Sequence, residues 1–149
     1  TSIGGYYGAS KVLGYKIARN QIKGYTLPQG LLHQMMCCSS RETISHIGIG
    51  TIVDPSLRGG ELNSLNNIHP DLVTKSEGKL LYRLPKSDLL LIRGKGYTED
   101  GYIVLEDEPI DLDICKLIDS AIVRKVKVAI QVPKKNCFRE GHNIYRLFR

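Results

Sequence analysis

Apolar residues recur along this chain with the spacing of a helix in some segments and of strands in others. The segment from residue 10 to residue 21 places Val12, Leu13, Ile17 and Ala18 on one helical face. Ser10 is a preferred N-cap residue, so we expect it to begin this helix. The segment therefore predicts an amphipathic helix with one apolar stripe.

A strand, a second helix and another strand are expected next. The apolar pattern predicts a strand at residues 22–27, a turn at residues 28–30, a helix at residues 31–38 and a strand at residues 43–47. The inward residues of the second helix are expected to be Leu31, Leu32, Met35 and Met36. The order strand, helix, strand is typical of a parallel sheet with crossover helices.

The chain from residue 51 to residue 75 lacks clear periodicity. Gly, Pro and Asn residues interrupt it, as at Asp54-Pro55, Gly59-Gly60 and His69-Pro70. A stretch of this length inside a compact domain is usually either functional or disordered. Its composition is not of low complexity, so we expect an ordered loop layer at the ligand face.

The rest of the chain returns to strands and one helix. Strands are expected at residues 79–84, 89–93, 102–105 and 126–132, and a helix from Asp111 to about residue 124. The turn before the third of these strands is expected at residues 99–101. Residues 88–92 are apolar on both faces, as a central strand of a doubly covered sheet must be. The fold class predicted is α/β, with a mainly parallel sheet.

Composition narrows the class of protein. The chain has 149 residues, of which 42% are hydrophobic and 24% charged, so a single ordered domain is the first expectation. The longest strongly apolar run, residues 89–92, is far shorter than a membrane span. The residues that follow Thr1 do not show the basic and apolar pattern of a signal peptide. We therefore expect a location in the cytoplasm, or in an organelle matrix if the protein is eukaryotic.

The net charge of +6 allows several partners. The favoured explanation of this charge is an ordinary solvated surface. Binding of an anionic small ligand, such as a nucleotide-bearing cofactor, comes second. Binding of nucleic acid comes last, because no RNA-binding or zinc-finger pattern is present. The four Cys residues show no CxxC spacing, so free thiols are favoured over a metal site or a disulfide. The four His residues lie in no triad or metalloprotease pattern.

Glycine-rich turns are the first candidates for chemistry. Gly4 and Gly5 precede the first helix, where backbone N–H groups could hold a carboxylate or a phosphate. For each glycine cluster considered alone, a purely structural turn is the favoured interpretation, because neither the dinucleotide fingerprint nor a Walker A sequence is present. Gln29 differs, since an amide between Pro28 and Gly30 at a strand end has little reason to be there for packing. It could donate to a carbonyl or carboxylate oxygen.

Several motifs in order resemble one known family. The segments are GGYYGASK (residues 4–11), YTLPQG (25–30), ISHIGIGTIVDPSLRGGELN (44–63), DLLLIRG (88–94) and TEDGYI (98–103), followed by the strand at residues 126–132. This succession resembles the first half of the family I coenzyme A transferases. The similarity covers residues 3–133, and it is nearest to the acetate or propionate type in which both halves are fused.

The resemblance implies a three-layer α/β/α domain and a ping-pong reaction. In that family a glutamate attacks an acyl-CoA, forms a glutamyl-CoA thioester and passes CoA to a second carboxylate. The nucleophilic Glu lies in the second half of the family, and no Glu of this chain stands in such a motif. The resemblance therefore implies no catalytic nucleophile here, no metal and no tightly bound cofactor. Coenzyme A is a substrate, short-chain acyl-CoA and carboxylates are ligands, and the second half is the partner within a complete protein expected to be oligomeric.

The resemblance also assigns site residues. Gln29 and Gly30 match the family's LPQG turn, and Gly48, Gly50 and Thr51 match its GxGT turn, so both are expected to contact the substrate or its oxyanion. The residues expected to shape the pocket entrance are Gly4, Gly5, Asp54, Gly60 and Asn63. The binding surface predicted is one wall of the carboxylate and acyl pocket.

Two departures from the family are visible. The family's earliest Gly-Gly-Phe motif is missing, so the first strand and helix of the domain are expected to be absent. Residues 134–149 lose the family pattern and become basic and aromatic. The predicted organisation is thus a partial transferase domain at residues 1–133 and a divergent basic tail at residues 134–149.

Two other functions stay open. One is a non-catalytic module on the same scaffold that binds an acyl-CoA or a sugar phosphate. The other is a sugar-phosphate isomerase, which would need a Lys or Glu base paired with an acidic partner. The LPQG turn argues against the isomerase, and CoA exchange separates the transferase from the binding module.

Overall fold

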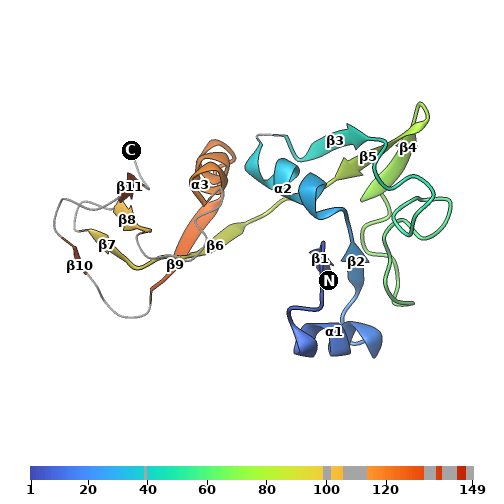
Figure 1. The fold of residues 1–149 in the computed structure, drawn as a ribbon, viewed down its shortest axis with the longest axis horizontal. Coiled ribbons are helices and arrows are strands. Elements are labelled where there is room, and N and C mark those ends of the chain that lie inside the picture. Colours follow the sequence, from blue (N-terminus) through green and yellow to red (C-terminus); the bar gives the residue numbers. More distant parts are fainter. Residues whose placement is uncertain (39, 99–101, 106–113, 133–136, 139–143, 147–149) are drawn as a thin grey trace. The chain divides into compact units, whose positions relative to one another are not determined.

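The computed structural model describes residues 1–38, 40–98, 102–105, 114–132, 137–138 and 144–146 (Figure 1). Two compact units divide the chain. Unit 1 contains Thr1–Met36 and Ser40–Lys86, and unit 2 contains Cys37–Ser39 and Ser87–Arg149. Composition alone predicted one domain. The predicted boundary between residues 133 and 134 stays a prediction, because most of the basic tail lies outside the described residues.

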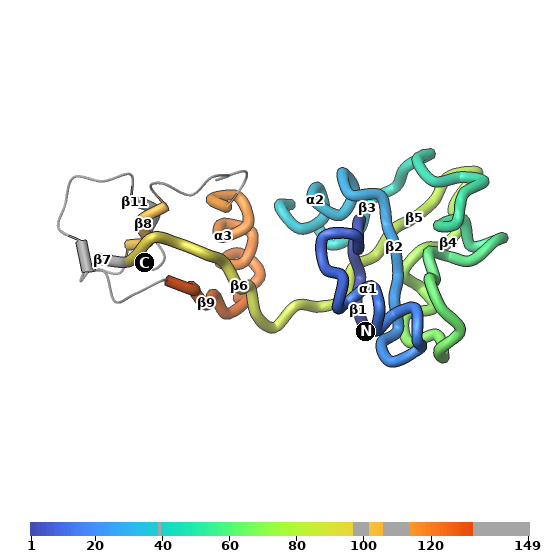
Figure 2. Tube along the Cα trace, turned by 60° about the horizontal axis from the view of Figure 1, so that its bottom comes forward, coloured from blue at the N-terminus to red at the C-terminus, as the bar shows by residue number. Residues whose placement is uncertain are grey.

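Unit 1 begins with two parallel strands, each followed by a helix. Strand β1 (Ser2–Gly4) pairs with β2 (Gly24–Thr26), so that Gly4 lies opposite Thr26. Helix α1 (Lys11–Ala18) connects the strands and α2 (Gln29–Cys37) follows β2. Figures 1 and 2 show β1 and β2 side by side. Because the strands are parallel, their carboxyl ends and the chain leading into both helices lie at one edge.

Helix α1 begins as its sequence predicts and ends earlier. The Ser10 Oγ accepts a hydrogen bond from the Leu13 N–H at 3.3 Å, which confirms the N-cap. The helix ends at Ala18, before the expected residue 21, and Asn20 has a positive φ of 54°. The predicted apolar stripe is largely wrong, since Ile17 is buried while Val12 is 68% exposed. Of the other two residues of the stripe, Leu13 is half-buried and Ala18 is exposed.

Helix α2 changes the interpretation of the LPQG segment. It begins at Gln29, so Gln29 and Gly30 are not a free turn but the first helical residues after β2. Leu31, Leu32 and Met35 are buried as predicted. Met36 is 43% exposed, contrary to the prediction, because one helical face is fully used by the other three apolar residues.

The second sheet of unit 1 is antiparallel. Strand β3 (Glu42–Ser45) pairs with β5 (Lys79–Arg83), and β5 pairs with β4 (Val73–Ser76). The expectation that the strand near residue 43 extends a parallel sheet is therefore wrong. Residues 73–75 lie within the predicted loop, but the structure places them in strand β4, which a turn at Glu77 and Gly78, both with positive φ, joins to β5. Most of the predicted loop layer, residues 51–72 of the predicted 51–75, contains turns held by backbone hydrogen bonds.

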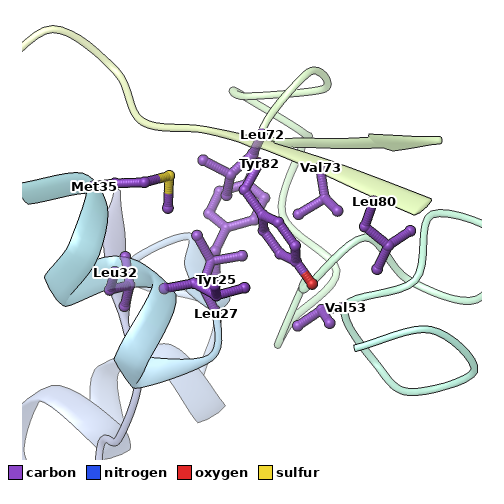
Figure 3. Close-up of a cluster of buried hydrophobic side chains, with 10 residues drawn as sticks. Tyr25, Leu27, Leu32, Met35, Val53, Leu72, Val73, Leu80 and Tyr82 are labelled. Carbon is purple, nitrogen blue, oxygen red and sulfur yellow. The ribbon is translucent and has the colours of Figure 1, made fainter. Parts of the chain in front are cut away.

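One apolar cluster joins the elements of unit 1 (Figure 3). Helix α2 contributes Leu31, Leu32 and Met35 to the cluster, while strands and the loop layer contribute the rest. The buried residues from strands and loops are Tyr25, Leu27, Val53, Leu72, Val73, Leu80 and Tyr82. Because Val53 and Leu72 come from the loop layer, these parts of it are attached to the core.

Unit 2 contains a parallel pair and a mixed sheet. Strands β6 (Leu89–Arg93) and β9 (Lys127–Gln131) pair in parallel, with α3 (Ile114–Val123) between them in sequence. The mixed sheet has the order β10-β7-β8-β11. The strands of this sheet are β7 (Gly96–Thr98), β8 (Tyr102–Val104), β10 (Cys137–Phe138) and β11 (Ile144–Arg146).

The core of unit 2 is formed by Ile92, Ile103 and Ile118. Helices and parallel strand pairs in both units confirm the α/β class. The predicted helix cap Asp111 and the predicted turn at residues 99–101 lie outside the described residues.

Strand β6 is covered on one face in the part of the chain that the structure describes. Ile92 is buried, whereas Leu89 and Leu91 are 55% and 66% exposed. The expectation of a strand buried on both faces is therefore wrong for the described residues, where Leu90 and Ile92 pack into the core with α3. None of the described helices combines the length and the apolar character that crossing a bilayer requires.

Two adjacent methionines test which face of α2 is buried. Met35 is 1% exposed and Met36 is 43% exposed. We expect Met35→Ala to lower the free energy of unfolding by about 3 kcal/mol, because it leaves a cavity in the core. Met36→Ala is the matched control and should change it by less than about 1 kcal/mol. Urea denaturation followed by circular dichroism measures both, and equal losses would contradict the assigned face.

Candidate functional site

The carboxyl edge of β1 and β2 brings Gly4, Gly5 and Gln29 together. A Cβ on Gly5 would lie 2.7 Å from the Gln29 Cβ and 3.0 Å from its Cα, so only glycine fits at this position. The Leu27 N–H donates to the Gly4 carbonyl at 3.1 Å. The two turns that the sequence singled out separately are therefore one structure, with the first packed directly against the start of α2.

The start of α2 is open. Gln29 and Gly30 are exposed, and a Cβ on Gly30 would have no heavy atom within 4 Å. The first N–H groups of a helix have no acceptor inside the helix, and they carry partial positive charge. With the Gln29 side-chain amide beside them, these groups can donate hydrogen bonds to a carboxylate or to an oxyanion.

Gly60 closes the other edge of β2. Its carbonyl accepts the Thr26 N–H at 2.7 Å, and a Cβ on Gly60 would lie 2.6 Å from the Thr26 carbonyl oxygen. Its φ of 85° also favours glycine. Gly60 therefore permits the loop layer to approach the strand end that leads into Gln29.

Asn63 is occupied by backbone groups. Its Nδ2 donates to the carbonyls of Ile17 and Ile22 at 2.9 and 2.7 Å. Its Oδ1 accepts the Gly24 N–H at 3.4 Å. These bonds tie the loop layer to the end of α1 and to the start of β2, which is the opposite end from Gln29.

The turn after β3 uses its polar groups internally. Gly48 and Gly50 have φ angles of 99° and 73°. The Thr51 N–H and Oγ1–H both donate to the Gly48 carbonyl, at 3.0 and 2.7 Å. The Gly50 N–H donates to Asp54 Oδ2 at 2.9 Å. The backbone amides of Gly50 and Thr51 are thus already paired in this structure.

Asp54 organises that turn from inside. It is 3% exposed, and its Oδ1 accepts the Ser56 N–H at 3.0 Å and the Ser56 hydroxyl at 2.7 Å. The bond from the Gly50 N–H, followed by those from Ser56, holds the pKa of the Asp54 carboxyl well below its usual range. Lys75 Nζ lies 3.5 Å from Oδ1. An ionised Asp54 therefore fixes the loop between Gly50 and Ser56.

The structure thus gathers the predicted residues into two groups. Gly4, Gly5, Gln29 and Gly30 lie at the β1–β2 edge with Gly60 beside Thr26, whereas Gly48, Gly50, Thr51 and Asp54 form the turn after β3. The Gly60 N–H, which donates to the Ile52 carbonyl at 2.8 Å, links the loop around the second group to the first. Substrate contact by any of these residues stays a prediction.

Lys23, which no sequence pattern singles out, is 2% exposed. Its ammonium donates to Glu61 Oε2 at 2.6 Å and to the carbonyls of Asn63 and Leu65 at 3.1 and 2.5 Å. It also lies 5.3 Å from the centroid of the Tyr25 ring. A lysine in a short apolar segment resembles a surface residue, so no sequence signal distinguishes it.

Three tyrosine hydroxyls were also missed. Tyr25 Oη donates to Asn67 Oδ1 at 2.5 Å and accepts the N–H groups of Ile68 and His69 at 2.9 and 3.2 Å. Tyr7 Oη donates to the Tyr25 carbonyl at 2.8 Å, and burial raises the pKa of the Tyr7 hydroxyl.

Tyr82 Oη donates to the Ile47 carbonyl at 2.5 Å. Burial, with a smaller contribution from the Asp54 charge, raises the pKa of the Tyr82 hydroxyl. The raised pKa values keep the Tyr7 and Tyr82 hydroxyls protonated. All three tyrosine hydroxyls donate hydrogen bonds, to Asn67 Oδ1 and to the carbonyls of Tyr25 and Ile47.

A cavity of about 430 Å³ lies within the loop layer of unit 1. Arg58, Glu61, Asn63, Asn67 and His69 contribute polar groups to its lining. In the part of the chain that the structure describes, no group of three or more His, Cys, Asp or Glu side chains could hold a metal ion. Among the described residues, Cys37, Cys38 and Cys115 form no disulfide.

Comparison with known proteins identifies relatives. The acetate CoA-transferase YdiF of Escherichia coli K12 is 31% identical over 135 residues, covering 87% of this chain and 25% of that protein. The caffeate CoA-transferase of Acetobacterium woodii is 28% identical over 110 residues, covering 69% of this chain and 21% of that protein. No model of a protein family matches the chain.

Solved structures that match this chain come from the same group of enzymes. The apoenzyme of the acyl-CoA transferase YdiF from E. coli O157:H7 matches with a TM-score of 0.76 at 30% identity, covering 95% of this chain and 28% of that one. Its thioester complex with CoA matches with a TM-score of 0.77 at the same identity. The chain belongs to the family I coenzyme A transferases.

The family predicted from the sequence motifs is therefore confirmed. The chain spans about a quarter of the length of the curated relatives that it matches. Its β1–β2 edge and loop layer lie in unit 1, and the match to the YdiF structure covers 95% of the chain.

Two ion pairs of unit 1 test how much the buried Lys23 contributes to stability. Glu61→Gln removes the charge that balances an ammonium whose side chain is 1% exposed, so we expect a loss of about 2 kcal/mol or more in the free energy of unfolding. Glu42→Gln breaks the exposed pair with Arg83 and should cost less than about 1 kcal/mol. Urea denaturation compares the two, and similar losses would show that Lys23 has no special role.

Alanine substitutions at two glycines test whether close packing around Gly48 contributes to the stability of the turn after β3. A Cβ on Gly48 would lie 2.3 Å from Val53 Cγ2 and 2.4 Å from Tyr82 Oη, whereas a Cβ on Gly50 meets no heavy atom within 4 Å. Both have positive φ, so each alanine costs about 1–2 kcal/mol of backbone strain. Overpacking should cost Gly48→Ala about 1–3 kcal/mol more. Thermal unfolding followed by circular dichroism measures the difference, and equal midpoints would refute it.

Proposed function

We propose that this chain supplies one wall of the active site of an acyl-CoA:carboxylate CoA-transferase. The complete protein would move CoA between a short-chain acyl-CoA and a carboxylate through a glutamyl-CoA thioester. The nucleophilic Glu would lie in a second half, which is the partner of this chain, fused or separate. Coenzyme A is then a substrate, and an oligomer in the cytoplasm or in an organelle matrix is the expected form.

The packing of Gly5 against Gln29 is the observation that supports this proposal. It places the Gly4-Gly5 turn and the start of α2 at one edge of a parallel strand pair, which is where α/β proteins bind ligands. The confirmed family adds the chemistry, since one relative is named an acetate CoA-transferase and YdiF forms a thioester complex with CoA.

The chemistry requires neutral donors. When a carboxylate attacks a thioester carbonyl, the carbonyl oxygen gains negative charge and must be stabilised until the leaving group departs. Gln29 and the first amides of α2 can donate to that oxygen without supplying a proton. We assign Gln29 and Gly30 to this contact, with Gly4, Gly5 and Gly60 allowing the backbone to come close.

The turn after β3 takes a supporting role in this proposal. Gly50 and Thr51 already donate within the turn, so they would shape the pocket through the position of their backbone. Asp54 would keep the turn rigid, and Asn63 would hold the loop layer against β2. These residues would therefore contribute to catalysis by keeping the pocket in shape, without contacting the reacting atoms.

A matched pair of glutamines on α2 tests the proposal. Gln29 and Gln34 are both exposed on the same helix, but only Gln29 lies at its start. The chain is mixed with a separately expressed second half, and CoA exchange between acetyl-CoA and propionate is measured. Gln29→Ala should lower kcat by about 10²-fold because one oxyanion donor is lost, and Gln34→Ala should leave it unchanged.

The outcomes separate the competing functions. No CoA exchange by the unsubstituted chain with its second half would refute the transferase proposal. Thermal stabilisation by CoA without turnover would support the non-catalytic acyl-CoA-binding module instead. Exchange that responds equally to Gln29→Ala and Gln34→Ala would keep the transferase but remove Gln29 from the oxyanion site.

A further inference from the structure

The cavity in the loop layer has walls that are fixed by hydrogen bonds. On one side, the Arg58 N–H donates to the Asp54 carbonyl and the Arg58 carbonyl accepts the Glu61 N–H, both at 3.1 Å. On the other side, the buried hydroxyl of Tyr25 holds Asn67 Oδ1 at 2.5 Å and the His69 N–H at 3.2 Å. Residues that line the cavity are thus held in place before any ligand arrives.

The charge balance of the lining is positive. Glu61 is the acidic residue of the lining, and its carboxylate lies 2.6 Å from the buried Lys23 ammonium, which offsets its charge. Arg58 is exposed, and among the described residues no carboxylate forms an ion pair with it. The guanidinium therefore remains available to an anion from solution.

Neutral donors complete the lining. Asn67 Oδ1 accepts hydrogen bonds from Tyr25 and from the His69 N–H, so the other end of the amide is the NH₂ donor, for which the described residues show no acceptor. The His69 ring lies tilted against the Tyr25 ring, with the centroids 6.0 Å apart. Arg58, Asn67 and His69 thus offer three donors around one space.

We propose that this cavity is a binding site for an oxyanion, the carboxylate or phosphate group of a small polar molecule. Arg58 supplies the charge, while Asn67 and His69 supply further hydrogen bonds. The volume of about 430 Å³ lies within the range of small-molecule sites. The proposal does not rest on the transferase function, because Gly4, Gly5, Gln29 and Gly30 do not line the cavity.

The test uses the full 149-residue chain and the proton NMR signals of its histidine rings. Inorganic phosphate and succinate are titrated separately, so that the two arms distinguish a phosphate site from a carboxylate site. We expect at least one of them to shift the His69 signal in a saturable way while His33, on the exposed face of α2, does not respond. Arg58→Gln should weaken binding about tenfold or more, since a charge-assisted hydrogen bond is lost.

Arg41→Gln is the matched control, because Arg41 is also an exposed arginine of unit 1 but does not line the cavity. It should leave the dissociation constant unchanged, and Arg58→Lys should weaken binding less than Arg58→Gln does. Circular dichroism verifies that each variant is folded. The absence of a saturable shift with either anion would overturn the proposal. Equal weakening by Arg58→Gln and Arg41→Gln would overturn it as well, because it would indicate general attraction to a basic surface.

Discussion

The need to satisfy the buried ammonium of Lys23 sets the architecture of unit 1. A charged group excluded from water must have acceptors, and Lys23 finds them in Glu61 and in the carbonyls of Asn63 and Leu65. All three belong to the loop layer, about forty residues away in sequence. The buried charge of Lys23, just before β2, therefore holds the loop layer against the edge of β2.

Other polar groups extend this attachment along β2. The Tyr25 hydroxyl holds the segment around Asn67 and His69, and the backbone of Thr26 pairs with Gly60. The loop layer thereby follows β2 toward the edge where Gly5 packs against Gln29. The same contacts that satisfy buried polar groups also place the proposed substrate wall and the proposed anion cavity on one rigid support.

Local chemistry allowed several elements to be predicted from the sequence. Ser10 caps α1 because its hydroxyl reaches a nearby N–H, and β6 spans the residues that its apolar run predicts. Predictions that depended on distant partners were wrong. Strand β3 pairs antiparallel with β5, a strand more than thirty residues later, instead of extending the parallel β1–β2 pair. Met36 is exposed because the other apolar residues of α2 already fill the core side.

The sequence by itself determined the α/β class, the coenzyme A transferase family and the glycines at the strand ends, because these depend on motifs of adjacent residues. Only the tertiary structure decided which glycines meet. Gly5 packs against Gln29 and Gly60 against Thr26, whereas Gly50 and Thr51 satisfy their own turn. It also identified Lys23 as buried. Such roles arise from contacts between residues far apart in the chain, which local patterns do not encode.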